Sequence, residues 1–252
     1  MFTNTFRPSL IALVVTLSFL SIGEVAAKKH QINYSSEPVL GHYYESAKQG
    51  LNSYELELIE LKEKQIILFS GGFGYPSFKP AKKFLKYIKE NKDIHFYISR
   101  GLGGSVREHK KFIRAVMNKC KKGKALTCQV TTYLDGQCSS MCTTLFLYGD
   151  KRLARDDTWA NLGFHRTTLV IAGRSVPFQG PSRMARYFSR FDINQEYLQE
   201  NKELIFGVPE NGFHRMSGTD LIESGFAHEL NPLLEGSIFS FLRSFHGIQI
   251  DF

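Results

Sequence analysis

Short apolar runs alternate with amphipathic stretches along this chain, and that alternation constrains the fold more than any other feature. Residues 65–69 are typical of a buried strand, and residues 93–99 carry apolar side chains at every second position. Residues 80–90 place their apolar side chains on one helical face, and residues 105–118 predict a second helix with Ser105 as N-cap. Strands that alternate with helices predict an α/β fold with a largely parallel sheet and flanking helices.

The same alternation continues toward the C-terminus. Further strands are predicted over residues 126–133, 159–164 and 226–230. Further helices are predicted over residues 142–148, 182–205 and 221–224, and the second of these is expected to break near residue 192. Residues 167–176 predict a hairpin. Residues 28–52 are polar and show little periodicity, so an irregular segment is expected there. The expected organisation is a lead-in over residues 28–60, one domain over residues 61–232, and a tail over residues 233–252.

The first 27 residues have the composition of a secretory signal peptide. Arg7 supplies the positive charge, residues 10–20 the apolar segment, and Val25-Ala26-Ala27 the small residues of a cleavage site. The apolar segment is shorter than the ~20 residues that span a bilayer. We therefore expect cleavage near Ala27 and a periplasmic or secreted protein. An uncleaved N-terminal membrane anchor is the alternative.

Basic residues give the chain a net charge of +8 and are distributed along its length. No motif that stacks on bases or enters a nucleic-acid groove accompanies them. The charge therefore predicts solvated helix faces or attraction to an anionic envelope surface, and no nucleic-acid partner is expected.

The four cysteines, Cys120, Cys128, Cys138 and Cys142, lie close together in the sequence. An exported protein meets an oxidising compartment, so two disulfides are expected, and we choose the local pairs Cys120–Cys128 and Cys138–Cys142 among three connectivities. A zinc site is one alternative, although the spacing and the lack of an adjacent histidine suit zinc poorly. A nucleophilic thiol at Cys138 is another, but an oxidised thiol is a poor nucleophile. No metal site is expected.

Small residues crowd a serine within residues 136–142, where the pattern predicts a turn from a strand into a helix. A helix N-terminus presents free N–H groups and the positive end of the helix dipole, so a hydroxyl there lies beside amides that could hold an oxyanion. His165, after the next extended run, could serve as its general base. The alternatives are a serine that caps the helix and a histidine with a structural hydrogen bond.

Four segments in this order resemble the proteolytic subunit of the Clp protease and its relatives in the crotonase-like superfamily. They are residues 63–69, residues 94–99 with the following Gly103-Gly104-Ser105-Val106, residues 136–141, and residues 162–165. The match runs from about residue 62 to residue 230. Cysteines on both sides of the serine, together with a signal peptide, resemble an exported bacterial branch of this group. The resemblance implies a ClpP/crotonase-like fold.

By position in these motifs, the resemblance implies that Ser140 is the nucleophile and His165 the general base. The amides of Gly104 and Met141 would form the oxyanion hole. The motif places the nucleophile one residue before Met141, which selects Ser140 over the neighbouring Ser139.

Two departures from the family pattern matter for the site. Residues 100–102 replace a shorter, proline-containing approach to the glycine pair, so this turn is remodelled. The family's third catalytic residue is an acid, and Phe213 lies near that position here. Glu210 and Asn211 are the nearby substitutes. A serine–histidine dyad is the alternative, because the acid mainly orients the imidazole.

These features predict an exported, stand-alone serine peptidase that acts on peptides or unfolded protein segments without a cofactor. The Clp subunit works with an ATP-driven unfoldase, but ATP is not expected outside the cytoplasm, so no such partner is expected. The family forms rings, which implies a homo-oligomer. One alternative is a non-catalytic binding or scaffold protein on the same fold. Another is crotonase-type acyl-thioester chemistry, which needs coenzyme A, and an exported protein should not meet that cofactor.

Overall fold

The computed structural model describes residues 31–34, 39–49, 52–74, 78–122, 125–166, 168–171, 174–177, 179–209 and 212–251. The predicted signal peptide, residues 1–27, lies outside these ranges. Among the helices within them, none is long and apolar enough to cross a membrane.

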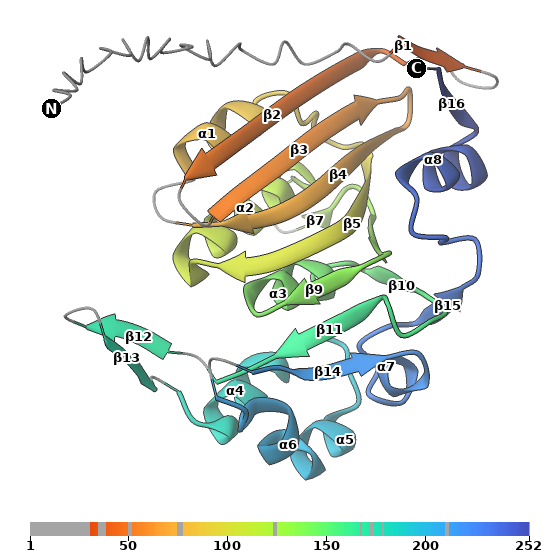
Figure 1. Ribbon diagram of the computed structural model, residues 1–252. Helices are drawn as coiled ribbons and strands as arrows, with labels where there is room; N and C mark the ends of the chain where they lie inside the picture. Colours follow the sequence, from red (N-terminus) through yellow and green to blue (C-terminus); the bar gives the residue numbers. More distant parts are fainter. Residues whose placement is uncertain are drawn as a thin grey trace, which may run out of the picture.

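Ten strands of the described residues form one mixed sheet (Figure 1). Its main path has the order β14-β11-β9-β5-β4-β3-β2. The bounds are β2 Gly41–Gln49, β3 Asn52–Glu60, β4 Lys64–Phe73, β5 Asp93–Gly104, β9 Gln137–Ser139, β11 Asn161–Phe164 and β14 His214–Ser217. Pairing is parallel from β4 through β5 and β9 to β11, and antiparallel at both ends of the path. The predicted α/β class with a largely parallel sheet is confirmed.

The sheet branches at β5. The first half of β5 pairs in parallel with β8 (Val130–Leu134), and β10 (Lys151–Arg155) and β15 (Glu229–Asn231) follow in parallel. The far end of β5 turns away and pairs with β9. Gly103 and Gly104 have φ angles of 81° and 117°, which residues with a side chain rarely adopt. They follow the point at which β5 passes from β8 to β9. Because Gly103 has no side chain, the end of β5 can lie against the start of α3 (Met141–Leu147).

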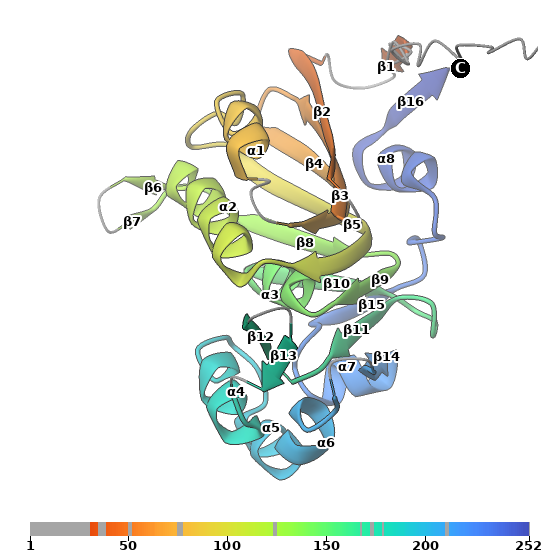
Figure 2. The same cartoon turned by 60° about the vertical axis from the view of Figure 1, so that its left-hand side comes forward.

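Helices cover both faces of the sheet, and each face has its own buried core. α1 (Phe78–Phe84), α2 (Val106–Lys119) and α3 lie on one face (Figure 2). The core on the other face is completed by α8 (Ile238–His246), whose Phe241 ring stacks on Tyr97 with the centroids 4.4 Å apart. α2 begins as predicted, because Ser105 Oγ accepts a hydrogen bond from Glu108 N at 3.4 Å.

The expectation of an irregular segment over residues 28–52 is wrong. These residues contain β1 (Gln31–Tyr34) and β2, and β2 pairs along its whole length with β3 as an edge strand of the main sheet. An edge strand needs few apolar side chains, so its sequence carries a weak pattern. At the other end of the chain, β16 (Ile248–Asp251) pairs antiparallel with β1.

The segment that follows β11 forms a group of short elements at one end of the sheet, at the bottom of Figure 1. They are β12 Thr168–Ile171, β13 Arg174–Pro177, α4 Pro181–Phe188, α5 Gln195–Glu200 and α6 Lys202–Phe206, and α7 Thr219–Glu223 comes after β14. β12 and β13 pair as the predicted hairpin, and its turn residues Ala172 and Gly173 lie outside the described residues. The predicted helical segment is broken, as expected, between α4 and α5.

Both predicted disulfides are present, and among the described residues, which include all four cysteines, none is free. The Cα atoms are 5.0 Å apart in Cys120–Cys128 and 5.2 Å apart in Cys138–Cys142. The bonded sulfurs rule out the zinc site and the nucleophilic thiol at Cys138. Two disulfides are typical of a protein that matures in an oxidising compartment.

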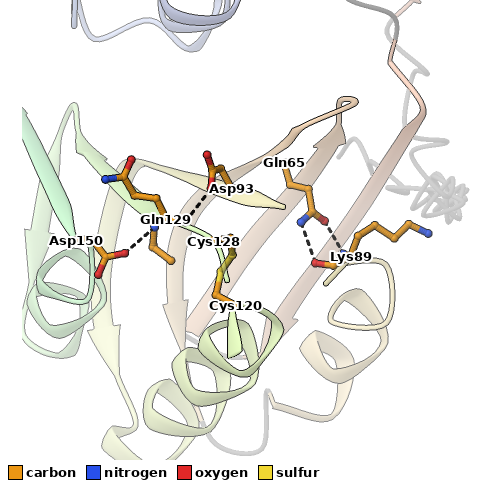
Figure 3. Close-up of a disulfide and its surroundings, with 8 residues drawn as sticks. Gln65, Lys89, Asp93, Cys120, Cys128, Gln129 and Asp150 are labelled. Atoms are coloured by element: carbon orange, nitrogen blue, oxygen red, sulfur yellow. Dashed lines mark hydrogen bonds between the residues drawn. A yellow bond between two sulfur atoms is a disulfide. The ribbon is translucent and has the colours of Figure 1, made fainter. Parts of the chain in front are cut away.

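The Cys120–Cys128 disulfide joins the end of α2 to the segment before β8 (Figure 3). The intervening hairpin consists of β6 (Lys121–Lys122) and β7 (Ala125–Leu126). Asp93 accepts a hydrogen bond from Gln129 N, and Asp150 accepts one from Val130 N, both at 2.8 Å. The chain therefore enters the sheet at Val130, later than the predicted strand start at residue 126.

Candidate active site

Ser140 lies between the end of β9 and the first residue of α3, with φ 57° and ψ −126°. A positive φ is uncommon for a residue with a side chain and is held when the surroundings over-determine it. The Ser140 hydroxyl makes no capping hydrogen bond to α3. Its backbone is fixed on both sides, because Ser140 N donates to Gly163 O at 2.7 Å and Thr143 Oγ1 donates to Ser140 O at 2.6 Å.

The Cys138–Cys142 disulfide closes a short ring around Ser140. Both cysteines are fully buried, and a Cβ atom on Gly101 of β5 would collide with Cys142 Sγ. The ring therefore packs directly on the backbone of β5. This contact needs glycine at residue 101 and holds the serine turn against the sheet.

His165 follows the last residue of β11, which pairs in parallel with β9 in a register that places Gly163 opposite Ser139. The two strands therefore end side by side, and His165 Nε2 lies 2.7 Å from Ser140 Oγ. The next residue is also anchored, because Arg166 N donates to Val208 O at 2.8 Å. An imidazole nitrogen at this distance can accept the proton of the hydroxyl.

The ring of Phe213 meets His165 edge-on, with the centroids 5.1 Å apart and the planes at 84°. Phe213 thus lies on one side of the imidazole, and the resemblance implies an acid near this position of the sequence. Glu210 and Asn211, the two sequence candidates for a third member, lie outside the described residues.

Ser140, His165, Gly104 and Met141, the four residues expected at the site, line one pocket of about 120 Å³. They come from three separate stretches of the sequence, which the pairing of β9 with β5 and with β11 brings together. The remaining lining residues are Val106, Thr143, Thr144, Phe164, Met184, Tyr187 and Phe188. The last three come from α4, which sequence reasoning did not connect to the site. The sequence indicated these residues only as part of the apolar face of a predicted helix. Such a face can line a pocket or pack in a core, and the pattern does not distinguish the two.

Among the described residues, no three His, Cys, Asp or Glu side chains are grouped as metal ligands would be. His95 and His109 do not line the pocket, and burial lowers the pKa of both to about 4.

No protein-family model and no curated protein matches this chain. The chemistry of the pocket follows from its own groups: a hydroxyl and an imidazole in hydrogen-bond contact, a helix N-terminus beside them, and apolar walls. This combination suits nucleophilic attack on a carbonyl carbon.

Proposed function

We propose that this protein is an exported serine hydrolase, a stand-alone peptidase that acts on peptides or unfolded protein segments. The observation that carries the proposal is the 2.7 Å contact between Ser140 Oγ and His165 Nε2 at a serine with positive φ. The four ordered motifs and the branched parallel sheet support a ClpP/crotonase-like fold. The two disulfides and the signal-peptide composition support export.

In the proposed reaction, His165 takes the proton from Ser140 as the hydroxyl oxygen attacks the scissile carbonyl carbon. The carbonyl oxygen becomes an oxyanion, which the amides of Gly104 and Met141 stabilise. His165 then gives the proton to the leaving amine, and water repeats the sequence to release the acyl group. No metal, organic cofactor or ATP-dependent unfoldase takes part. Glu210 or Asn211 would complete a triad, and without either the pair works as a dyad.

The pocket walls fit this substrate class. Phe164, Met184 and Phe188 present apolar and aromatic surface next to the serine. Such a pocket holds an apolar side chain of a peptide while the polar groups act on the adjacent carbonyl. Folded substrates would not offer an extended segment to a pocket of this size, so peptides and unfolded segments are the expected substrates.

The test is hydrolysis of unfolded casein and of a panel of quenched fluorescent peptides by the purified protein. Ser140→Ala and His165→Ala should each lower the rate by at least about 10³-fold, as in other hydrolases of this type. Ser139→Ala is the matched control, because it removes a neighbouring hydroxyl that does not line the pocket, and it should keep most of the activity. A folded protein without hydrolysis would favour the non-catalytic binding or scaffold alternative.

A further inference from the structure

A second cavity, of about 630 Å³, lies beside the proposed active site and is strongly basic. It is lined by Lys110, Gln179, Ser182, Arg183, Arg186, Tyr187 and Arg190. Four of these seven described residues are cationic, and none of them carries a carboxylate. A fifth cation, Arg114, lies one helical turn beyond Lys110 on α2.

The two cavities are built by the same pair of helices. Tyr187 lines both of them. On α2, Val106 faces the active-site pocket and Lys110 faces the basic cavity. These two positions are one helical turn apart, a distance of ~6 Å along the helix axis. Figure 2 shows α2 and α4 on the same side of the sheet. A ligand that leaves the proposed active site along these helices therefore meets the basic cavity next.

Most of the positive charges in and next to this cavity form no ion pair with the described residues. Within the described part of the chain, no salt bridge involves Lys110, Arg114, Arg186 or Arg190. Glu108, the acidic residue of α2, pairs instead with Arg107 and Lys111.

Tyr187 holds two of the cations in place. Lys110 Nζ lies 4.6 Å and Arg190 Cζ 5.7 Å from the centroid of its ring. Burial lowers the pKa of Lys110, and the nearby charges of Arg114 and Arg190 add to this effect. Like charges held this close repel one another, and an anionic ligand would relieve that repulsion.

We propose that the basic cavity binds carboxylate side chains of the substrate, so that the peptidase prefers peptides with acidic residues on one side of the scissile bond. This specificity rests on the proposed function. Guanidinium groups present paired N–H donors that match a carboxylate. An extended peptide advances ~3.3 Å per residue, so acidic residues about two to four positions from the cleaved bond reach the cavity.

Binding to the full-length Ser140→Ala protein tests the inference without turnover. The probes are two fluorescein-labelled peptides with the same apolar centre, one with three glutamates on one flank and the other with three glutamines there. Each peptide is also made with the charged flank on the opposite side. The glutamate peptide should bind at least about tenfold more tightly in one of the two orientations, and salt should reduce the difference because it screens exposed charges.

The variant Arg186→Gln/Arg190→Gln should lose most of this preference while it binds the glutamine peptide unchanged. The matched control is Lys82→Gln/Lys86→Gln, which removes the same charge from exposed positions on α1 and the turn after it. The control should keep the preference. Covalent labelling by a fluorophosphonate, measured in arginine variants that retain Ser140, should be unaffected.

Equal affinity for the two peptides would overturn the inference, and so would an equal loss in the lysine control. Binding to anionic phospholipid vesicles without discrimination between the peptides would also overturn it, because the cavity would then contact a membrane surface. If labelling of Ser140 succeeds while the peptides bind equally, the proposed hydrolase function is retained and the proposed preference for acidic peptides is rejected. If labelling of Ser140 fails while the preference for the glutamate peptide is observed, the proposed reaction is rejected and the anion-binding site is retained.

Discussion

A Cβ atom on Gly103 would lie 2.6 Å from the Cβ atom of Ser140 and 2.8 Å from the carbonyl oxygen of Ser139. Gly103 also has a φ of 81°. The end of β5 can therefore touch the serine turn because residue 103 has no side chain. This contact couples the glycine-rich end of one strand to the geometry of the proposed nucleophile.

Gly103→Ala should consequently destabilise the fold and disturb Ser140. The unfavourable φ and the close contact together should lower the free energy of unfolding by about 1–3 kcal/mol. Urea denaturation and fluorophosphonate labelling measure the two effects. Gly180→Ala is the control, since nothing lies within 4 Å of the added Cβ atom, and its cost should stay below about 1 kcal/mol. Normal labelling and stability in Gly103→Ala would show that the turn tolerates a side chain.

The two disulfides should differ in what they do for the site. Replacement of either pair by alanines removes a short covalent loop and should cost about 2–3 kcal/mol. Loss of Cys138–Cys142 should also slow labelling of Ser140, because this bond brackets the serine. Loss of Cys120–Cys128 should leave the labelling rate close to that of the native protein. Equal labelling rates in the two double variants would contradict a positioning role for Cys138–Cys142.

Arg152 should be essential for stability, because it connects the segments that follow α3, α4 and α7. It is 2% exposed, and its guanidinium donates to the carbonyl oxygens of Gly149, Asp192, Gly225 and Phe226. Arg152→Met would leave buried carbonyls without donors and should cost about 3–5 kcal/mol. Arg152→Lys should recover part of this loss, because one ammonium cannot reach all four oxygens. Chemical denaturation measures both variants, and a Met variant as stable as the native protein would refute the assignment.

Stability should fall as the pH drops below about 6.5, in part because of buried histidines. Burial lowers the pKa of His109 to about 4, so the unfolded chain takes up its proton first as the pH falls. The contribution is complete above about pH 6.5 and is lost toward pH 4, with a slope of up to about 1.4 kcal/mol per pH unit. In His109→Leu, the free energy of unfolding should therefore depend less steeply on pH between pH 6 and pH 4, by the contribution of one proton. Denaturation series of both proteins measure this difference, and identical slopes would contradict it.

The elements that could be predicted are those whose local apolar pattern matches the side chains that are buried in the structure. β4 and α2 follow directly from an apolar run and an amphipathic helix with its serine cap. The strand β2 was missed because its mostly polar sequence carries little apolar pattern. Its pairing with β3 and the contacts of Tyr43 and Glu45 exist only in the folded structure. α8 was missed because its apolar side chains pack on the second face of the sheet, and the sequence alone does not show that this face must be buried.

The candidate site divides in a similar way. The order of the motifs predicts that Ser140 and His165 meet, since both follow strands that end at one edge of the sheet. The positive φ of Ser140 occurs between the paired end of β9 and the Cys138–Cys142 disulfide, and of these features only the disulfide could be predicted from the sequence. The basic cavity joins Lys110 to arginines more than 70 residues later in the sequence. Only the packing of α4 near α2 reveals it.

The central claim is that the Ser140 hydroxyl is made reactive by His165, and the most direct test is to locate a covalent adduct. The purified protein is treated with a fluorophosphonate, digested and mapped by mass spectrometry, with Ser140→Ala and Ser139→Ala in parallel. We expect one adduct per chain on Ser140, its absence in Ser140→Ala and its retention in Ser139→Ala. An adduct on a different serine, or none on the folded protein, would contradict it.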